Sequence, residues 1–394
     1  MSSNRIAWVE RSCRLLADTA AELEKTRPFD GLTIGASIHL EPKTSALMLT
    51  LQRGGARVVA TGNLNTTQPE TAAHLRAHGI DVRGEQTADA ERHAGFLDEV
   101  VAVRPDLLLD NGGDLFARYA ARPWPELRGG TEETTSGRMR LVPLRDQIAR
   151  PVLVINDSPI KQFAENRHGV GQSVLESFLR FTNRVTNGRR VTVFGYGACG
   201  RGVAASFRNA FGVVSVFDSV PVSALEAHLD GFLTPSREDA IATADVIVTV
   251  TGARGVLDVD DLPLLKDGVV LANAGHLPWE IAVDVIEGAE SVKRTEHYDD
   301  GITTWHLADG RAIHLLGRGH MVNLAGPRPL GNSIESMDLG FTLQARCLEA
   351  IARGDVGPDA CVVPVPPDID ARVATAYLEI ARTGRQKSGS EVLS

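Results

Sequence analysis

The chain has few cysteines, and their spacing does not pair them. The four thiols are widely separated along the sequence, at Cys13, Cys199, Cys347 and Cys361, and no CxxC pair occurs. Because a disulfide framework or a structural zinc site needs closely spaced or paired cysteines, this pattern disfavours both. We therefore expect reduced thiols, no bound metal and a cytoplasmic location.

Long apolar runs and basic clusters are also missing. No segment approaches the roughly 18 uninterrupted apolar residues of a membrane-spanning helix, and the amino-terminal segment lacks the apolar core of a signal peptide. The net charge of −9 disfavours a nucleic-acid partner, because phosphate backbones attract basic proteins. We expect no membrane and no nucleic-acid partner, which leaves a small molecule as the ligand.

Segments typical of strands and helices alternate before residue 160. The segments with strand character are GLTIGASIHL, ARVVATG and PDLLLD. Helical spacing of apolar residues is found between them, in PKTSALMLTLQRGG and QPETAAHLRAHG. Regular alternation of strand and helix predicts a parallel α/β sheet.

A second α/β series begins after a long predicted helix. That helix is expected in GQSVLESFLRFTNRVTNG, with its end at Gly188. Four later segments have strand character, namely RRVTVFGYG, VVSVFDS, DVIVTVTG and GVVLANAGH. The sequence ITTWHLADGRAIHLL is typical of a hairpin. With 394 residues, the chain is long enough for two domains.

A glycine-rich loop, GYGACGRG, joins the first strand of this second series to a helix. Gly195 permits a tight turn, Gly197 lets the backbone approach a pyrophosphate, and Gly200 lets helix and strand pack closely. Ala198 and Cys199 lie between these glycines, at the amino terminus of the helix, where phosphate charge is favoured. The loop predicts a dinucleotide cofactor.

Asp218 follows the next predicted strand, 18 residues beyond Gly200. A carboxylate at this place binds both hydroxyls of the adenosine ribose and repels a 2′-phosphate. The carboxylate of Asp218 therefore predicts that the cofactor is NAD rather than NADP.

Several motifs together resemble the S-adenosylhomocysteine hydrolase family, over residues 30 to 375. They occur in that family's order and approximate spacing: ASIHLEPKTSALMLTL, DNGGDL, EETTSG, NDSPIKQFAEN, GYGACGRG, VTVTG and NAGH. MDLGFTLQA also resembles the helix that closes the substrate domain of the family. The EPK sequence resembles the short, archaeal-type branch. The resemblance implies an α/β fold of two doubly wound, parallel-sheet, Rossmann-like domains.

The resemblance also implies where the two domains lie in the chain. Residues 1–165 and 333–394 would form the substrate and catalytic domain, and residues 170–330 the NAD-binding domain. The family is homotetrameric, with a terminal lysine and tyrosine segment that crosses to a neighbouring subunit. This chain lacks that segment, so a homo-oligomer of two or four subunits is expected.

Family chemistry implies a catalytic set. NAD oxidises the sugar of a nucleoside at 3′, the group at 5′ leaves by elimination, water adds, and the ketone is reduced again. Lys161 matches the base near the 3′ hydroxyl, and a lysine can lose its proton whereas an arginine cannot. His276 matches a residue on the 3′ side, while His39, Asp110 and Asn111 match the 5′ acid/base machinery.

Further residues are implied at the substrate and at the cofactor. Those expected at the substrate are Glu133, Glu165, Asn166, Lys43, Thr44 and Asn332. Those expected at NAD, besides the glycine loop and Asp218, are Thr134, Thr135, Ser136, Thr251, Gly252, Asn273 and Asn323. Any one of these residue types is more often a cap or a solvated side chain. Lys43 leaves the base undecided between adenine and hypoxanthine.

The sequence departs from the family pattern at four places. Asn111 stands where the family has a carboxylate of the 5′ machinery, and an amide cannot carry a proton. Asn332 and Ser333 replace a His-Pro pair at the substrate entrance. Glu165 replaces an aspartate. The carboxyl-terminal tail lacks the lysine and tyrosine segment of the family.

These departures lead to three hypotheses. The first is a repurposed nucleoside dehydratase, which eliminates water from a hydroxymethyl group of an adenine nucleoside and leaves an alkene. Such a reaction needs Lys161 and NAD but not the whole 5′ relay. The second is hydrolysis of S-adenosylhomocysteine or S-inosylhomocysteine to a nucleoside and homocysteine. The third, an NAD-binding regulatory protein without turnover, is disfavoured because Lys161, Glu133 and His276 are retained.

Overall fold

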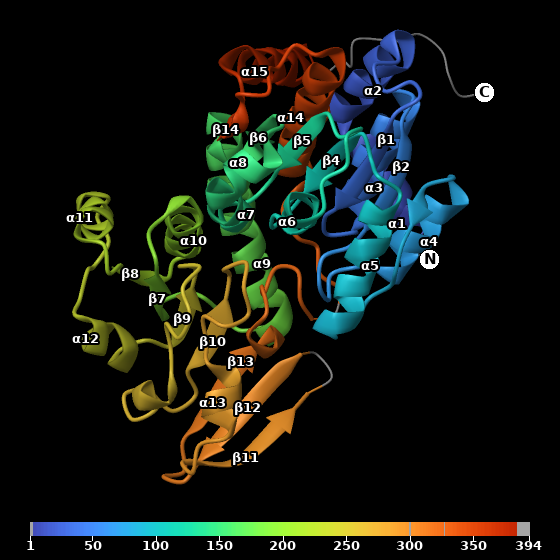
Figure 1. Cartoon of the computed structure of the whole chain (residues 1–394). Helices are drawn as coiled ribbons and strands as arrows, with labels where there is room; N and C mark the ends of the chain where they lie inside the picture. Colours follow the sequence, from blue (N-terminus) through green and yellow to red (C-terminus); the bar gives the residue numbers. More distant parts are fainter. Residues whose placement is uncertain (1–2, 299–300, 327, 384–394) are drawn as a thin grey trace. The chain divides into compact units, whose positions relative to one another are not determined.

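A computed structural model describes residues 3–298, 301–326 and 328–383. The chain forms two compact α/β units, shown in Figure 1. The first contains the residues up to 162 and those from 334 onward, and the second contains residues 163–333. The domain bounds expected from the sequence differ from these by one to seven residues.

The first unit contains a seven-stranded sheet in which every pair of neighbours is parallel. In spatial order its strands are β14 (Cys361–Pro364), β6 (Val152–Val154), β5 (Gly129–Glu132), β4 (Leu107–Asp110), β1 (Thr33–Ser37), β2 (Arg57–Thr61) and β3 (Asp81–Val82). Strands β4 and β6 are buried along their whole length. Helices that cover both faces of a parallel sheet explain such apolar strands.

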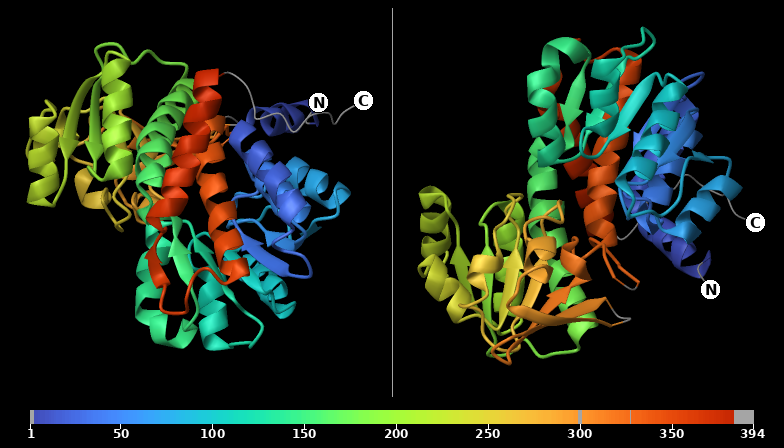
Figure 2. Two further views of the ribbon diagram at one scale, coloured as in Figure 1. Left: turned by 90° about the horizontal axis from the view of Figure 1, so that it is seen from above. Right: turned by 60° about the horizontal axis from the view of Figure 1, so that its bottom comes forward.

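Helices connect these strands and cover the sheet. Those before residue 163 are α1 (Ser3–Ser12), α2 (Arg14–Thr26), α3 (Pro42–Arg53), α4 (Pro69–Ala77), α5 (Ala90–Ala102), α6 (Asp114–Ala121), α7 (Thr135–Leu141) and α8 (Arg145–Ile148), with short turns η1 (Val142–Leu144) and η2 (Ile155–Asp157). The chain returns to this unit with α14 (Ile334–Arg353) and α15 (Pro367–Thr383). Helix α14 packs against α2, α3 and α15, as Figure 2 shows for the red and blue ends of the chain.

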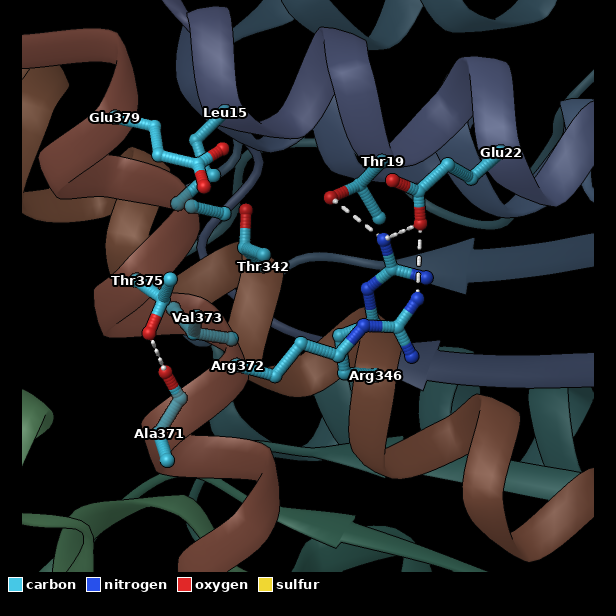
Figure 3. A pocket seen from close by; sticks show the side chains of 11 residues that line it. Leu15, Thr19, Glu22, Thr342, Arg346, Ala371, Arg372, Val373, Thr375 and Glu379 are labelled. Atoms are coloured by element: carbon cyan, nitrogen blue, oxygen red, sulfur yellow. Dashed lines mark hydrogen bonds and ion pairs between the residues drawn. The ribbon is translucent and has the colours of Figure 1, made fainter.

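Two polar features join the carboxyl-terminal helices to α2. Asp338 accepts hydrogen bonds from the backbone N–H groups of Leu15 at 2.9 Å and Leu16 at 2.8 Å, and so caps α2. Farther along α2, arginines of α14 and α15 share one carboxylate, that of Glu22. They line a cavity of about 380 Å³, drawn in Figure 3.

The sheet of the second unit is mixed. In spatial order its strands are β11 (Val292–His297), β12 (Ile302–Leu307), β13 (Ala312–Leu316), β10 (Val270–Asn273), β9 (Val246–Thr249), β7 (Arg190–Phe194) and β8 (Val213–Phe217). The strands from β13 to β8 are parallel to their neighbours. The predicted hairpin is confirmed as β12 and β13, which pair antiparallel, and β11 extends this antiparallel edge.

Helices of the second unit include one whose predicted end is wrong. The elements are η3 (Lys161–Gly169), which starts in the first unit, α9 (Val170–Thr182), α10 (Ala198–Asn209), α11 (Pro221–Leu229), α12 (Arg237–Ala242), η4 (Val259–Asp261), α13 (Val283–Glu287) and η5 (Gly317–Gly319). Helix α9 ends at Thr182 and not at Gly188, because Asn183 adopts the left-handed conformation with φ 47°. The segment η3 is a π-helix, which periodicity did not predict.

The carboxyl group of Asp338, which caps α2, should make the stability of the protein depend on pH. Burial raises the pKa of Asp338 to about 7, above the value of about 3.9 for an unfolded aspartate. The folded state therefore holds the proton more tightly, and the free energy of unfolding falls as the pH rises from about 4 to about 7. Asp338→Asn should remove this part of the slope in urea unfolding, whereas the exposed Asp355→Asn should keep it. Identical slopes for Asp338→Asn and the unsubstituted chain would contradict the assignment.

Candidate active site

The strand order of the first unit reverses between β1 and β4. Strand β2 lies on one side of β1, whereas β4 lies on the other, with Ser37 paired to Asp110. In doubly wound sheets, ligands bind beyond the carboxyl ends of the strands at such a reversal. The segments that leave the sheet here, 38–40 and 111–113, carry the predicted residues His39 and Asn111.

Lys161, Glu133 and Asn111 meet near this reversal. Lys161 Nζ donates to Glu133 Oε1 at 2.8 Å, and Asn111 Nδ2 donates to Glu133 Oε2 at 2.8 Å. All three side chains are buried. Burial alone would raise the pKa of Glu133, but the charge of Lys161, the two hydrogen bonds and the charge of His39 together lower that pKa below its usual value. Glu133 is therefore an ionised acceptor with a donor on each oxygen.

Asn63 belongs to the same cluster, although no motif pointed to it. Its Nδ2 donates to Asn111 Oδ1 at 2.8 Å and to the Asn111 backbone carbonyl at 3.1 Å. The signal that could have found Asn63 is its position two residues beyond β2, next to the reversal. From the same loop, Thr66 Oγ1 lies 2.8 Å from His39 Nδ1 and orients the imidazole.

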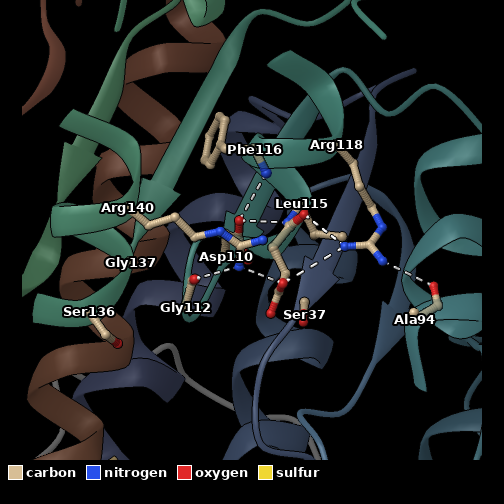
Figure 4. Close-up of polar contacts among 12 residues, drawn as sticks. Ser37, Ala94, Asp110, Gly112, Leu115, Phe116, Arg118, Ser136, Gly137 and Arg140 are labelled. Carbon is tan, nitrogen blue, oxygen red and sulfur yellow. Dashed lines mark hydrogen bonds and ion pairs between the residues drawn. The ribbon is translucent and has the colours of Figure 1, made fainter. Parts of the chain in front are cut away.

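Asp110 was expected in the catalytic set, but its carboxylate faces the start of α6. It accepts from the backbone N–H groups of Leu115 at 2.8 Å and Phe116 at 3.0 Å, as Figure 4 shows. Burial, and next the charge of Asp114, raise the pKa of Asp110 to about 7. The side chain is completely buried, so Asp110 shapes the loop, and its catalytic role stays a prediction.

Glu132 is a second buried carboxylate that was not predicted. It accepts from the backbone N–H groups of Gly112 at 3.0 Å and Gly113 at 2.9 Å, and from both N–H and Oγ1 of Thr134 at 2.7 Å. A Cβ atom on Gly137 would lie 2.1 Å from Glu132 Oε1, so the glycine of EETTSG makes room for this carboxylate. Glu132 thus joins the loops after β4 and β5.

The remaining predicted residues of the first unit are tied into the same loops. Thr134 caps α7 through the Gly137 N–H, and Ser136 Oγ lies 3.2 Å from Thr134 Oγ1. Thr135 Oγ1 accepts from Asn156 Nδ2 at 2.9 Å. The three hydroxyls belong to the residues that directly follow Glu133, and these contacts hold them in place. Their contact with NAD stays a prediction.

Lys43 and Thr44, expected at the substrate, lie in the first turn of α3. Lys43 is buried, and its Nζ donates to Glu41 Oε2 at 2.8 Å. Thr44 Oγ1 donates to the His39 carbonyl at 2.6 Å and so holds the turn that carries His39. The charge of Lys43 is thus compensated within its own unit, and contact of either residue with a base stays a prediction.

The strand order of the second unit reverses between β7 and β9, where the glycine loop leaves β7. Gly195 has φ 102°, and a Cβ atom there would lie 2.8 Å from the Val250 carbonyl. A Cβ atom on Gly200 would lie 2.0 Å from the Gly195 carbonyl. A Cβ atom on Gly197, in contrast, would meet nothing within 4 Å. Gly197 therefore leaves open space where α10 starts with Ala198 and Cys199.

Asp218 follows β8 and is bound to the glycine loop. Its Oδ2 accepts from the Tyr196 N–H at 2.7 Å, and its Oδ1 accepts from the Val220 N–H at 2.8 Å. The carboxylate is thereby held beside the loop, at the position where a ribose-binding acid is expected.

Two side chains brace the loops after β9 and β10. The buried Glu280 accepts from Thr251 N–H at 2.9 Å, Thr251 Oγ1 at 2.9 Å and Gly252 N–H at 2.7 Å. Asn273 accepts from Gly275 N–H at 2.7 Å, and its Nδ2 donates to three backbone carbonyls. Asn273 is completely buried and holds the NAGH loop, and its contact with the cofactor stays a prediction.

The other predicted residues of the second unit fall into two groups. Asn323 Nδ2 donates to Ser173 Oγ at 3.0 Å, and Ser173 Oγ donates to Asn332 Oδ1 at 3.0 Å, so Asn332 is joined to α9. Glu165 and Asn166 lie in η3, and His276 follows β10. The roles predicted for the second group stay predictions.

Neither a metal centre nor a membrane segment is found in the described part of the chain. Over residues 3–298, 301–326 and 328–383, no cluster of three His, Cys, Asp or Glu side chains could hold a metal ion. No helix in those ranges is long and apolar enough to cross a membrane. The four cysteines are free, and the cytoplasmic location expected from them stays a prediction.

Comparison with known proteins gives the family. The model described as "S-adenosyl-L-homocysteine hydrolase" matches residues 2–122, and "S-adenosyl-L-homocysteine hydrolase, NAD binding domain" matches residues 166–328. The adenosylhomocysteinase of Thermotoga maritima is 39% identical over 381 residues, which cover 95% of this chain and 93% of that protein. The chain belongs to the S-adenosyl-L-homocysteine hydrolase family.

Other members are similar over the same length. The S-inosyl-L-homocysteine hydrolase of Methanopyrus kandleri is 36% identical over 381 residues, 95% of this chain and 89% of its own. The adenosylhomocysteinase of Pyrococcus abyssi gives the same identity and the same coverage. Relatives with two different names therefore match this member of the S-adenosyl-L-homocysteine hydrolase family at 36–39% identity.

NAD is the cofactor of this S-adenosyl-L-homocysteine hydrolase family member, and the second unit fits it. The open space at Gly197 leaves room for a pyrophosphate. Helix α10 begins there and presents its amino-terminal N–H groups, which favour phosphate charge. The Asp218 carboxylate, fixed at the loop, suits two ribose hydroxyls.

Asp218 predicts the cofactor preference. Asp218→Asn should weaken NAD binding by about tenfold or more, because a hydrogen bond to a charged group contributes about 1.5–3 kcal/mol. The affinity for NADP should fall less or rise, because the repulsion of a 2′-phosphate is removed. Calorimetric titration with both cofactors measures this, with the exposed Asp260→Asn as the matched control. An NAD affinity within twofold of the unsubstituted protein would exclude the assigned role.

Proposed function

We propose that this enzyme oxidises the sugar of a purine nucleoside with NAD and hydrolyses the bond to homocysteine at 5′, with S-adenosylhomocysteine or S-inosylhomocysteine as substrate. The observation that supports this most is the buried Lys161–Glu133 ion pair beside the strand reversal. The relatives named as hydrolases, 36–39% identical over 95% of the chain, support hydrolysis. They give no specific support to the dehydratase hypothesis and leave the base undecided.

The proposed chemistry divides the first step between two side chains. When bound, NAD accepts a hydride from the sugar carbon. The ionised oxygens of Glu133 suit hydrogen bonds from sugar hydroxyls. Lys161 Nζ, once uncharged, takes the hydroxyl proton as the C–H electron pair leaves with the hydride. His39, oriented by Thr66, is the proposed proton carrier on the 5′ side.

A dehydratase is the second candidate, because of Asn111. In this chain the side chain at that position donates to Glu133 and cannot carry a proton to or from a 5′ group. Elimination of water from a hydroxymethyl group, without later addition of water, would need fewer proton transfers at that side. Asn332, bonded to Ser173, also changes the segment where the family has its His-Pro pair.

The proposal is tested with Lys161→Met and a panel of nucleosides. The protein with NAD is mixed separately with S-adenosylhomocysteine, S-inosylhomocysteine, adenosine and a C-hydroxymethyl adenine nucleoside. NADH absorbance and product masses are followed. Lys161→Met should slow NAD reduction by about 10²–10⁴-fold, the usual effect of a lost general base, whereas the exposed Lys293→Met should not.

The products distinguish the candidates. Release of homocysteine supports hydrolysis. Loss of water from the hydroxymethyl nucleoside, without homocysteine turnover, would replace hydrolysis by dehydration. If no nucleoside reduces NAD, both enzymatic candidates are wrong and the regulatory hypothesis takes their place.

We also propose that the protein is a homo-oligomer of two or four subunits. Apolar side chains on and beside α11 and the edge strand β8 are 47–76% exposed: Val213, Val220, Val222, Leu225, Leu229 and Leu233. A cluster of exposed apolar side chains is typical of an interface between proteins. A two-fold axis would let the same surface cover itself.

Charged side chains on α11 should disrupt such an assembly. The double variant Leu225→Asp with Leu229→Asp places two carboxylates on this surface, which should shift the mass in solution towards that of the monomer. Size-exclusion chromatography with light scattering measures the mass. Val285→Asp, at a residue that is 54% exposed outside this surface, is the control. An unchanged mass for the double variant would exclude this surface as the interface.

A further inference from the structure

The contacts of Asn63 fix the orientation of the Asn111 amide. The backbone carbonyl of Asn111 can only accept a hydrogen bond, so the Asn63 group 3.1 Å from it is the NH₂ group. The same NH₂ group lies 2.8 Å from the Asn111 side chain, which must therefore present its carbonyl oxygen there. At the other end of the Asn63 amide, Ser37 Oγ donates to the side-chain oxygen Asn63 Oδ1 at 3.3 Å.

Glu133 consequently faces the donor end of the Asn111 amide. Asn111 Nδ2 donates to Glu133 Oε2 while Lys161 Nζ donates to Oε1, both at 2.8 Å. If residue 111 were a carboxylate, its oxygen would face a Glu133 oxygen at this distance. Two carboxylates that close share a proton, because they cannot both ionise. Because residue 111 is an amide, Glu133 has no second carboxylate beside it with which to share a proton, and it can stay ionised.

We propose that Asn63 is a positioning residue that, through Asn111, fixes Glu133 as an ionised acceptor for the sugar hydroxyls, and that position 111 sets the pH range of sugar oxidation. This rests on the proposed function of Glu133 and Lys161. The chain of contacts runs from Ser37 through Asn63 and Asn111 to Glu133, and at each step the first side chain donates to the next residue.

The other charged groups near Glu133 are compatible with this role. Lys161 and His39 both favour its ionised form. Asp110 and Glu132, the neighbouring carboxylates, are held by backbone N–H groups at the start of α6 and in the loops after β4 and β5.

A double-mutant cycle tests the positioning role. Asn63→Ala and Asn111→Ala are made singly and together in the protein with NAD, and the rate of NAD reduction by adenosine is measured from pH 5 to 9. Each single variant should slow the reaction by about tenfold, and the double variant should be no slower than Asn111→Ala. Asn65→Gly is the matched control, because Asn65 lies in the same loop with φ 60°, which glycine adopts readily.

Asn111→Asp tests the role of position 111. The pH profile of this variant should show an ionisation that the unsubstituted protein lacks, from the proton shared with Glu133. Multiplicative effects of Asn63→Ala and Asn111→Ala, a full rate for Asn63→Ala, or the same pH profile for Asn111→Asp and the unsubstituted protein would each overturn the proposal.

A readout without turnover separates this proposal from the proposed function. In protein labelled with ¹³C at the glutamate carboxyl groups, Glu133→Gln assigns the Glu133 signal. That signal should stay at the ionised position from pH 5 to 8 in the unsubstituted protein and titrate in Asn111→Asp. If no nucleoside of the panel reduces NAD but the signals behave in this way, the proposed function fails and the positioning network stands. A Glu133 signal that titrates in the unsubstituted protein overturns the network.

Discussion

The structure around the first strand reversal depends on one buried ion pair, Lys161 with Glu133. Removing two charges from water costs several kcal/mol for each ion, and their attraction offsets this only where further hydrogen bonds satisfy both groups. Asn111 supplies the second donor to Glu133, and Asn63 holds Asn111. The loops after β2, β4 and β5 must therefore lie close together, and this requirement links segments that are far apart in the sequence.

Both units fix their loops by the same device, a carboxylate that accepts backbone N–H groups. Glu132 does so after β4, and Glu280 does so after β9. A carboxylate with several backbone donors holds a loop more firmly than solvent would, and hydrogen bonds to a charged group are the stronger kind. Asp218 belongs to this class as well, so binding a cofactor would use a group that already organises its loop.

Much of this arrangement could be predicted, because strand ends and glycine loops leave local patterns in the sequence. Family motifs that follow apolar strands located His39 and Asn111, and the spacing of glycines located the cofactor loop. The position of Asn63 just beyond β2 is a local signal, but its partner lies 48 positions away. Glu132 could not be found from local patterns, since its role arises from contacts with residues 19–20 positions away. Nor could the end of α9, because an asparagine in a left-handed conformation is a weaker signal than the glycine beyond it.

Asn111 has consequences for charge as well as for proton transfer. With an amide at this position, the charges of Lys161 and Glu133 cancel, whereas a carboxylate would add a negative charge to a cluster of buried side chains. The amide therefore suits a cluster that keeps Glu133 ionised, and it leaves the 5′ proton to another group. His39, whose imidazole is oriented by Thr66, is the titratable side chain that leaves the sheet at the same reversal. Under the proposed function, the choice between addition of water and elimination alone depends on whether His39 can both give and take a proton without a carboxylate at position 111.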